Sequence, residues 1–384
     1  MVAGYIMSLD SIESLEKYIF NGIYSTKLST PSNYWKKHHE ATFADYATMQ
    51  PGDNIYFFIK RKIYGIGEIV QVGDDCKFLN YPNANKPFNF TYNDIKNDLL
   101  WDEGEHSKDQ RWICVFKPNP NFFMNGIDMD EALSSNPSKF RSLRAFWKVS
   151  FIKLDDDENQ ALKDVILKNN QHLLNNSDKD FIFNSKYQDY HLKILNLLKN
   201  NNYKFEMNEI LSSCCDAAKL KHEMAIEAGI LFQLSNKEKE TTEIFGQWDY
   251  ISHQVIASPF KPVDYMDKMD IFGYSFIPEY NPTKSKFLVM ELKKDNANKE
   301  DIDQLLKYVD WVNDDYSHGD YSMIHSFLVA SGFSEDVINY SKEIGIRKYV
   351  LGRRPPKSEE WSNLKLVKYS FDEIDNKIRF DLVK

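Results

Sequence analysis

The chain has 384 residues and a formal net charge of −9, and 42% of its residues are hydrophobic and 14% aromatic. This length exceeds one typical domain, and the apolar content is sufficient for two hydrophobic cores. The net negative charge argues against a protein that coats nucleic acid non-specifically. It does not exclude a nuclease, because a metal site concentrates carboxylates while a local basic stripe can face phosphates.

Residues 1–155 are expected to form a compact, mostly β domain. "GYIMSL" predicts a strand, and "DSIESLEKYIFNG" predicts a helix that opens with a capping box at Asp10 and Glu13. "GDNIYFFIKRKIYGIGEIVQVG" predicts a hairpin that turns at its basic K-R-K triplet, with Gly65 and Gly67 breaking the second strand. Further short strands are expected in "QRWICVFKP" and "KVSFIKL".

The amino-acid composition changes after residue 155. Residues 156–210 are acidic and then rich in Asn, so we expect a helical connector with loose loops. Residues 211–384 alternate between strand-like and helix-like segments, which predicts an α/β domain with a mixed sheet flanked by helices. The expected fold class is therefore α+β or α/β, with a small β domain joined to a mixed-sheet domain.

Several protein classes find no support in the sequence. The sequence contains no run of about 18 apolar residues, the length that could span a bilayer. The first twenty residues lack the features of a signal peptide, so we expect a cytoplasmic protein without a membrane partner. Cys76, Cys114, Cys214 and Cys215 form no CxxC pair and are expected to be reduced thiols. No Walker A loop, dinucleotide fingerprint or serine-hydrolase elbow occurs.

The hairpin segment at residues 49–73, "MQPGDNIYFFIKRKIYGIGEIVQVG", resembles the PUA-like class that includes EVE and YTH domains. This resemblance implies a small β-barrel whose pocket holds a modified or flipped base. Such a pocket needs aromatic faces for stacking and a few polar groups that read the edge of the base. The candidates for base recognition are Tyr24, Ser25, Asn33, Tyr34, Trp35, Trp101 and Trp112.

Two acidic residues stand at the ends of neighbouring predicted strands in the second half. Asp270 lies in "DKMDIFGYSF", and Glu291 ends "KFLVMELK" after a turn-rich segment that suits a hairpin. Carboxylates at corresponding ends of such a pair could share one Mg²⁺, with the backbone carbonyl of Leu292 as an additional ligand. Lys293 points to the same face as Glu291 and could orient or help deprotonate a metal-bound water, and stabilise charge on a phosphate.

Two predicted helices add further polar groups. "DIDQLLKYVDWV" places Gln304 and Tyr308 four residues apart on one helical face. Upstream, "KLKHEMAIEAGIL" carries Glu223 and Glu227, also four apart, and either could direct a carboxylate at the site. Sequence spacing alone leaves the choice between these two glutamates open.

Together these residues resemble the PD-(D/E)xK nuclease superfamily, and in particular its RecB/NucS-like branch, over about residues 216–350. Met stands where the family motif has Pro before the Asp. The resemblance implies a metal-dependent phosphodiesterase in which Mg²⁺ or Mn²⁺ is the cofactor. The catalytic and metal-binding residues it implies are Asp270, Glu291, Leu292, Lys293, Gln304 and, of the two helix glutamates, preferably Glu223.

The expected function is a Mg²⁺-dependent DNA endonuclease, by analogy of domain pairing a restriction or anti-phage defence enzyme that reads a modified base. Lys60, Arg61, Lys62 and Lys294 are the candidates for contacts with the DNA backbone. Two cuts on a duplex need two active sites, so a homodimer is expected. Two alternatives remain open: a catalytically inactive nuclease-fold protein that binds or senses nucleic acid, and a nuclease directed at RNA.

Overall fold

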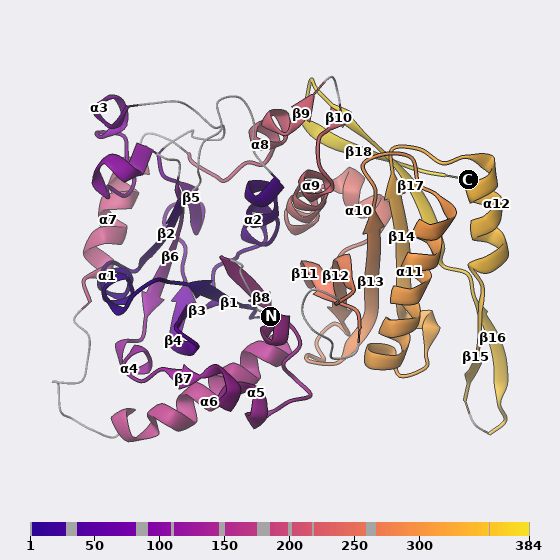
Figure 1. Cartoon of the computed structure of the whole chain (residues 1–384), viewed down its shortest axis with the longest axis horizontal. Helices are drawn as coiled ribbons and strands as arrows, with labels where there is room; N and C mark the ends of the chain where they lie inside the picture. The colour runs from indigo at the N-terminus through magenta and orange to yellow at the C-terminus, as the bar shows by residue number, and fades with distance from the viewer. Residues whose placement is uncertain are drawn as a thin grey trace. The chain divides into compact units, whose positions relative to one another are not determined.

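The computed structural model describes residues 2–27, 37–81, 91–108, 111–145, 150–174, 185–198, 202–216, 219–258, 266–352 and 354–383 (Figure 1). They form two compact units, one of Met1–Trp35 with Met49–Glu206 and one of Lys36–Thr48 with Met207–Lys384. Each unit combines helices with a sheet, so the mixed α and β fold class is confirmed. No helix within the described ranges is long and apolar enough to cross a membrane.

The first unit is built on one sheet. Its strands run in the order β2 (Ile23–Lys27), β6 (Arg111–Pro118), β4 (Lys62–Ile69), β3 (Asn54–Ile59), β1 (Gly4–Ser8) and β8 (Phe151–Leu154), with β5 (Lys77–Leu79) on β6 and β7 (Ile127–Asp128) on β4. Strands β1 and β3 pair in parallel, and the other described neighbours pair antiparallel. Its helices are α1 (Ile12–Asn21), α3 (Tyr92–Ile95), α4 (Pro120–Phe123), α5 (Met129–Ser135), α6 (Asp156–Leu174) and α7 (Tyr187–Leu198). Among the described residues no pairing joins β2 to β8, so the expected PUA-like barrel is not confirmed.

The hairpin of β3 and β4 forms as the sequence predicts, but its glycines have a different role. Lys60 and Arg61 both have positive φ, the backbone of a tight two-residue hairpin turn. Strand β4 continues through Gly65 and Gly67, which do not break it. A Cβ on Gly67 would lie 2.6 Å from Ile55 Cγ2, so glycine is needed there because a neighbouring side chain packs over the backbone.

The start of α1 also differs from the prediction. Its N-cap is Ser11, whose hydroxyl accepts a hydrogen bond from Ser14 N, so the expected cap at Asp10 with Glu13 is wrong by one residue. The helix ends at Gly22, whose φ of 62° is the left-handed conformation typical of a helix stop.

The segment expected as a connector contributes α6 and α7 to the first unit. Leu162 and Ile166, four residues apart on α6, pack against Ile6 and Tyr56 of the sheet in one buried apolar cluster. Because this apolar stripe is covered by the sheet, α6 is part of a core.

The second unit has a mixed sheet, as predicted for this part of the chain. Its strands run in the order β11 (Tyr250–Ile256), β12 (Lys268–Phe276), β13 (Lys284–Leu292), β14 (Ile324–Ala330), β17 (Leu364–Asp372) and β18 (Lys377–Leu382). The pairs β13–β14 and β14–β17 are parallel, and the other neighbours are antiparallel. Two small hairpins, β9 (Cys215–Asp216) with β10 (Lys219–Leu220) and β15 (Arg347–Leu351) with β16 (Lys357–Trp361), lie outside this sheet.

Helices cover both faces of the second sheet. Figure 1 shows α9 (Glu223–Ser235) and α10 (Lys239–Phe245) on one side and α11 (Lys299–Val312) on the other, with α12 (Glu335–Ile344) against α11. The short α8 (Asn208–Ser213) also packs on α9. Helix α2 (Lys37–Ala47), which precedes β3 in the chain, packs against α9 and belongs to this second unit.

Candidate active site

The antiparallel register of β12 and β13 brings two of the predicted acidic residues together. Ile271 pairs with Met290, so Asp270 and Glu291 lie at the same end of the hairpin. Leu292 N donates a hydrogen bond of 2.8 Å to Asp270 Oδ2. This arrangement is the strand-end pair of carboxylates that the sequence predicts.

Lys293 contacts the same group of side chains. Its Nζ lies 2.6 Å from Glu291 Oε1 and 3.6 Å from Asp301 Oδ1 at the start of α11. Glu291 is only 1% exposed, and within the described structure its second oxygen, Oε2, is buried without a hydrogen-bond partner. A buried, unpartnered carboxylate oxygen is costly, and an additional cation would satisfy it.

Of the two helix glutamates, Glu227 has the hydrogen-bonded link to Asp270. Gln254 Nε2 lies 3.2 Å from Glu227 Oε1 and 3.1 Å from Asp270 Oδ1. Glu223 lies in the first turn of α9, where its Oε1 accepts a hydrogen bond of 3.4 Å from Lys294 N. Burial is the main cause that raises the pKa of Glu227 and Glu291, and the charge of Glu223 adds a smaller increase to both, so all three carboxylates lie in one neighbourhood.

The carboxylates of this group hold their protons more tightly than isolated ones. Burial, followed by the charges of Glu227 and Glu291, raises the pKa of Asp270 well above its usual range. Burial raises the pKa of Glu291 to about 7, against the lowering effect of Lys293. For Lys293, burial lowers the pKa, but the hydrogen bond and charge of Glu291 outweigh it and raise the pKa above the usual value. Clustered acids with raised pKa values are typical of functional sites.

Some features of this cluster suit a divalent cation and others do not. No group of three or more Asp, Glu, His or Cys side chains in the described part of the chain is arranged to hold a metal ion. Lys293 and Gln254 already donate to Glu291 and Asp270, at oxygens that a cation would use. The donor set nevertheless suits Mg²⁺, which binds through one or two carboxylates and retains several waters. The unpartnered Glu291 Oε2 and the raised pKa values both indicate a local shortage of positive charge.

Gln304 contacts Tyr308 of the same helix. Helix α11 begins with a capping box in which Asn298 and Asp301 exchange side-chain and backbone hydrogen bonds. Gln304 Nε2 then donates a hydrogen bond of 2.8 Å to Tyr308 Oη, one turn along the helix. Burial, with smaller contributions from the charges of Glu291 and Asp270, raises the pKa of Tyr308 to about 12.

Three site residues were not singled out from the sequence: Asp45, His253 and Gln254. His253 Nδ1 lies 3.1 Å from Glu227 Oε2, and Asp45 of α2 lies on the other side of the imidazole. Burial lowers the pKa of His253, but the charges of Asp45 and Glu227 outweigh it and raise that pKa above its usual value. One signal in the sequence did point to Glu227, because it interrupts an otherwise apolar helix whereas Glu223 begins it.

The candidates for base recognition that the structure describes lie in the first unit, and their aromatic rings contact other aromatic rings. Tyr24 is buried with its ring centroid 5.4 Å from that of Tyr18, and Trp112 is buried and stacked on Phe205 at 6.2 Å. Ser25 is also buried. Trp101 is half-buried and donates from Nε1 to Glu103. Asn33, Tyr34 and Trp35 lie outside the described residues.

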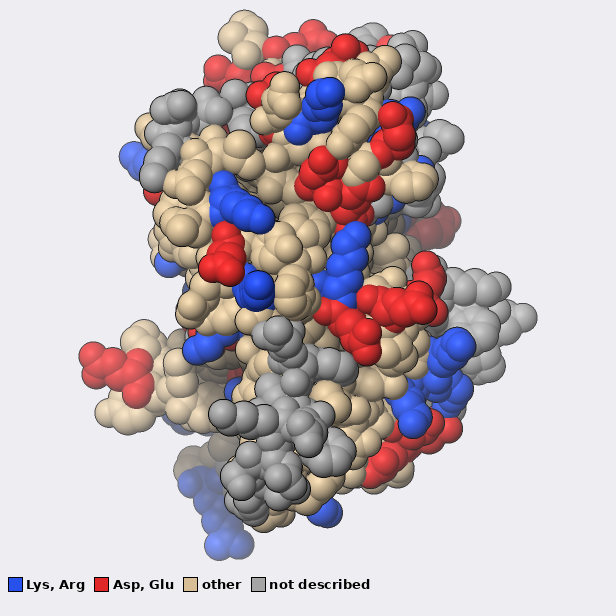
Figure 2. Space-filling view, turned by 90° about the vertical axis from the view of Figure 1, so that its left-hand side faces the viewer, with Lys and Arg blue, Asp and Glu red and all other residues tan. Residues whose placement is uncertain are grey.

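The candidates for DNA-backbone contacts are exposed. Lys60, Arg61 and Lys62 surround the β3–β4 turn, where Arg61 forms an ion pair of 2.6 Å with Asp130. Lys294 lies 3.6 Å from Asp295. On the face of the molecule that Figure 2 shows, Lys and Arg of the described residues are interspersed with Asp and Glu and form no continuous basic stripe.

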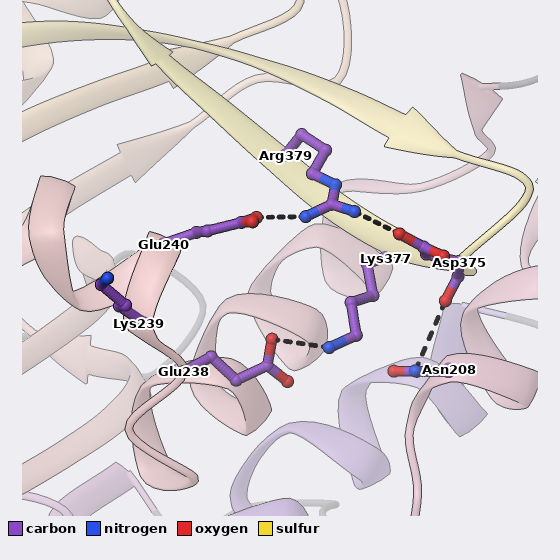
Figure 3. Close-up of a pocket in the computed structure, with 7 residues that line it drawn as sticks. All are labelled: Asn208, Glu238, Lys239, Glu240, Asp375, Lys377 and Arg379. Carbon is purple, nitrogen blue, oxygen red and sulfur yellow. Dashed lines mark hydrogen bonds and ion pairs between the residues drawn. The ribbon is translucent and has the colours of Figure 1, made fainter.

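An open pocket of about 580 Å³ lies elsewhere in the second unit (Figure 3). Its lining residues are Asn208, Glu238, Lys239, Glu240, Asp375, Lys377 and Arg379. Lys377 pairs with Glu238 at 3.1 Å, and Arg379 pairs with Glu240 and Asp375. The pocket contains none of the residues singled out from the sequence.

Comparisons with known proteins identify no family for the chain. No family model matches it, and no curated protein matches it. Among solved structures, similarity is found to a repair endonuclease from Pyrococcus abyssi (18% identity, TM-score 0.20, covering 29% of this chain and 42% of that one). Similarity is also found to a hypothetical protein from Leishmania major (12% identity, TM-score 0.26, covering 45% of this chain and 98% of that one). A YTH domain in complex with m6A is similar as well (13% identity, TM-score 0.24, covering 47% of this chain and 89% of that one). The chain thus spans less than half the length of the repair endonuclease, and TM-scores this low do not establish a shared fold.

Proposed function

We propose that the chain is a metal-dependent nuclease of the PD-(D/E)xK type that hydrolyses DNA. The observation that carries the proposal is the convergence of Asp270, Glu291 and Lys293 at one end of the β12–β13 hairpin. Glu227 is joined to Asp270 through Gln254, which extends the acidic group to α9. Carboxylates with one lysine form a suitable set for a divalent cation and a phosphate.

In this proposal each residue has a distinct part. Asp270 and Glu291 would hold the cation, with the Leu292 carbonyl and one helix glutamate as further oxygen ligands. A bound Mg²⁺ or Mn²⁺ would lower the pKa of water and stabilise negative charge on the phosphate. Lys293 would stabilise the anionic phosphate and orient the attacking water. Gln304 orients Tyr308 at the edge of the group.

The test is cleavage of plasmid and linear DNA by the purified protein with Mg²⁺, Mn²⁺ or EDTA. We expect nicking or cutting that requires the metal, and a loss of at least about 100-fold in rate for Asp270→Asn and Lys293→Met. Glu343→Gln on the exposed face of α12 is the matched control and should cut like the wild type. Cleavage in EDTA, or wild-type rates in both site variants, would overturn the proposal.

A second candidate is a nuclease-fold protein that binds nucleic acid without turnover. It is favoured by one observation: the described residues provide no ready group of three metal-binding side chains. Calorimetry separates the two functions. Mn²⁺ binding that is lost in Asp270→Asn supports the nuclease, whereas nucleic-acid binding without any Mn²⁺ binding supports the second candidate.

The finer parts of the proposal rest on the sequence resemblance. They are a restriction or defence role, recognition of a modified base by the first unit, and a homodimer that cuts both strands. Parallel digestion of unmodified, cytosine-methylated and phage-modified DNA tests the recognition, and matched RNA tests the alternative substrate. Sedimentation velocity of the protein tests the homodimer.

A further inference from the structure

Helix α2 brings a buried acidic residue to the rear of the candidate site. Asp45 is 5% exposed and lies near the C-terminal end of α2. Its Oδ1 accepts a hydrogen bond of 3.0 Å from Ser252 Oγ and one of 3.4 Å from His253 N. Asp45 Oδ2 lies 3.7 Å from His253 Nε2, so this carboxylate contacts both the backbone and the ring of one histidine.

The histidine in turn contacts an acid of the site. His253 Nδ1 lies 3.1 Å from Glu227 Oε2, while the other oxygen of Glu227 faces Gln254, which reaches Asp270. The imidazole therefore stands between carboxylates from α2 and α9. An unbroken series of polar contacts runs from Asp45 to Asp270.

We infer that Asp45 and His253 form a positioning pair that holds Glu227 in the orientation needed to complete the metal-binding group. This inference rests on the proposed nuclease function and deepens it. Carboxylate–histidine pairs behind a metal-binding group orient its members, and their loss typically costs about 10- to 100-fold in metal affinity or activity. On this basis helix α2 supplies a positioning residue to the catalytic unit, although it comes from the N-terminal part of the chain.

A second carboxylate–histidine pair joins α2 to the start of α9 outside the candidate site. Buried charged groups are often replaced by apolar residues without loss of stability, because desolvation offsets much of their attraction. The same two helices offer an internal comparison: Glu40 of α2 is fully buried and lies 2.9 Å from His222 Nδ1, which precedes α9. Within the described residues Glu40 contacts His222 and Cys214, and neither contact extends to Asp270 or Glu227.

The test measures Mn²⁺ affinity by calorimetry, the melting temperature in EDTA, and kcat and KM separately. His253→Leu removes the donor to Glu227, whereas His253→Asn retains one near the position of Nδ1. We expect His253→Leu and Asp45→Asn to weaken Mn²⁺ binding by about 10- to 100-fold. We expect His253→Asn to recover most of it, and KM for DNA to change little.

Glu40→Gln is the matched control, because it alters a buried contact of the same helix pair without contacting Glu227. Its Mn²⁺ affinity should remain close to that of the wild type. Wild-type Mn²⁺ binding by both His253→Leu and Asp45→Asn overturns the inference. An equal loss in Glu40→Gln also overturns it, because docking of α2 would then be the cause.

The result for Asp270→Asn separates this inference from the proposed function. If Asp270→Asn is inactive while His253→Leu and Asp45→Asn both bind Mn²⁺ normally, only the inference fails. If Asp270→Asn cuts DNA like the wild type, or the wild type binds no Mn²⁺, both fail.

Discussion

Gln254 and Asp270 are joined by a hydrogen bond of 3.1 Å, and the same amide nitrogen lies 3.2 Å from Glu227. One side chain therefore bridges carboxylates from β12 and α9. Gln254 has a φ of 52°, in the left-handed region that few side chains adopt readily. The position thus combines an unusual backbone conformation with a contact at the candidate site, a combination that often marks functional residues.

We expect Gln254→Asn to lower the cleavage rate by about 10-fold or more while leaving the fold intact. Asn tolerates positive φ, but its side chain is one methylene shorter and cannot reach both carboxylates. Steady-state cleavage with increasing Mn²⁺ measures the effect. Gln254→Gly, which relaxes the backbone and removes the amide, should lose at least as much activity. Full activity in both variants would show that the bridge has no part in the reaction.

The cap of α11 provides a test of how the helix is held beside β13. Asn298→Ala should lower the free energy of unfolding by about 1 kcal/mol, because Asp301 N loses the oxygen that caps it. Urea unfolding followed by circular dichroism measures this loss. Asn298→Asp keeps an acceptor at the same position and should remain close to the wild type. An unchanged midpoint in Asn298→Ala would contradict the capping role.

The sequence predicted those parts of the site that depend on local pattern. The apolar run before Glu291 and the turn after β12 determine a hairpin, and its antiparallel pairing necessarily brings Asp270 to the same end. Glu223 and Glu227 could not be separated from spacing alone, because both lie on α9 and only tertiary contacts distinguish them. The contact of Asp45 with His253 could not be predicted from the sequence, because 208 residues separate the two.

The first unit shows the same limit. Gly65 and Gly67 carry the local signature of a broken strand, yet β4 continues through them because side chains from β3 fill the space above. Residues 156–210 have the polar composition of a solvent-exposed segment, yet α6 packs into the core because it carries an apolar stripe. The deciding contacts of α6 come from residues distant in the sequence, whereas those at the two glycines come first from the neighbouring strand of the hairpin.

Glu158 of α6 supports the first unit through backbone contacts. Its Oε1 accepts hydrogen bonds of 2.6 Å from Arg141 N, 2.8 Å from Ser142 N and 3.3 Å from Leu143 N. We expect Glu158→Ala to destabilise this unit by on the order of 3 kcal/mol, because several N–H groups lose their acceptor. Chemical denaturation followed by tryptophan fluorescence measures the loss.

Glu158→Gln is the control for this prediction, because its carbonyl oxygen can still accept. Burial, followed by the charge of Asp155, raises the pKa of Glu158 to about 8, so a neutral amide replaces a side chain that is largely protonated at pH 7. This variant should lose much less stability than Glu158→Ala. Equal losses would mean that the hydrogen bonds to the 141–143 turn are not what stabilises it.

The acidic group of the second unit predicts how stability changes with pH in the absence of metal. In the folded state the pKa of Glu291 is raised to about 7 from an ordinary 4.5, first by burial. The folded protein therefore binds more protons than the unfolded chain between these values, and its stability falls as the pH rises from about 4.5 to about 7. The raised pKa of Lys293 does not oppose this trend, because its contribution stays constant below the ordinary lysine pKa of 10.5.

Differential scanning calorimetry in EDTA at pH 5, 6, 7 and 8 measures this trend. Glu291→Gln removes one titrating group and should show a shallower fall of the melting temperature than the wild type across the same range. Saturating Mn²⁺ should raise the wild-type melting temperature more at pH 8 than at pH 5, because the cation binds the ionised carboxylates. An equal slope in wild type and Glu291→Gln would contradict the raised pKa of Glu291. A Mn²⁺ effect that does not depend on pH would place the ion away from these carboxylates.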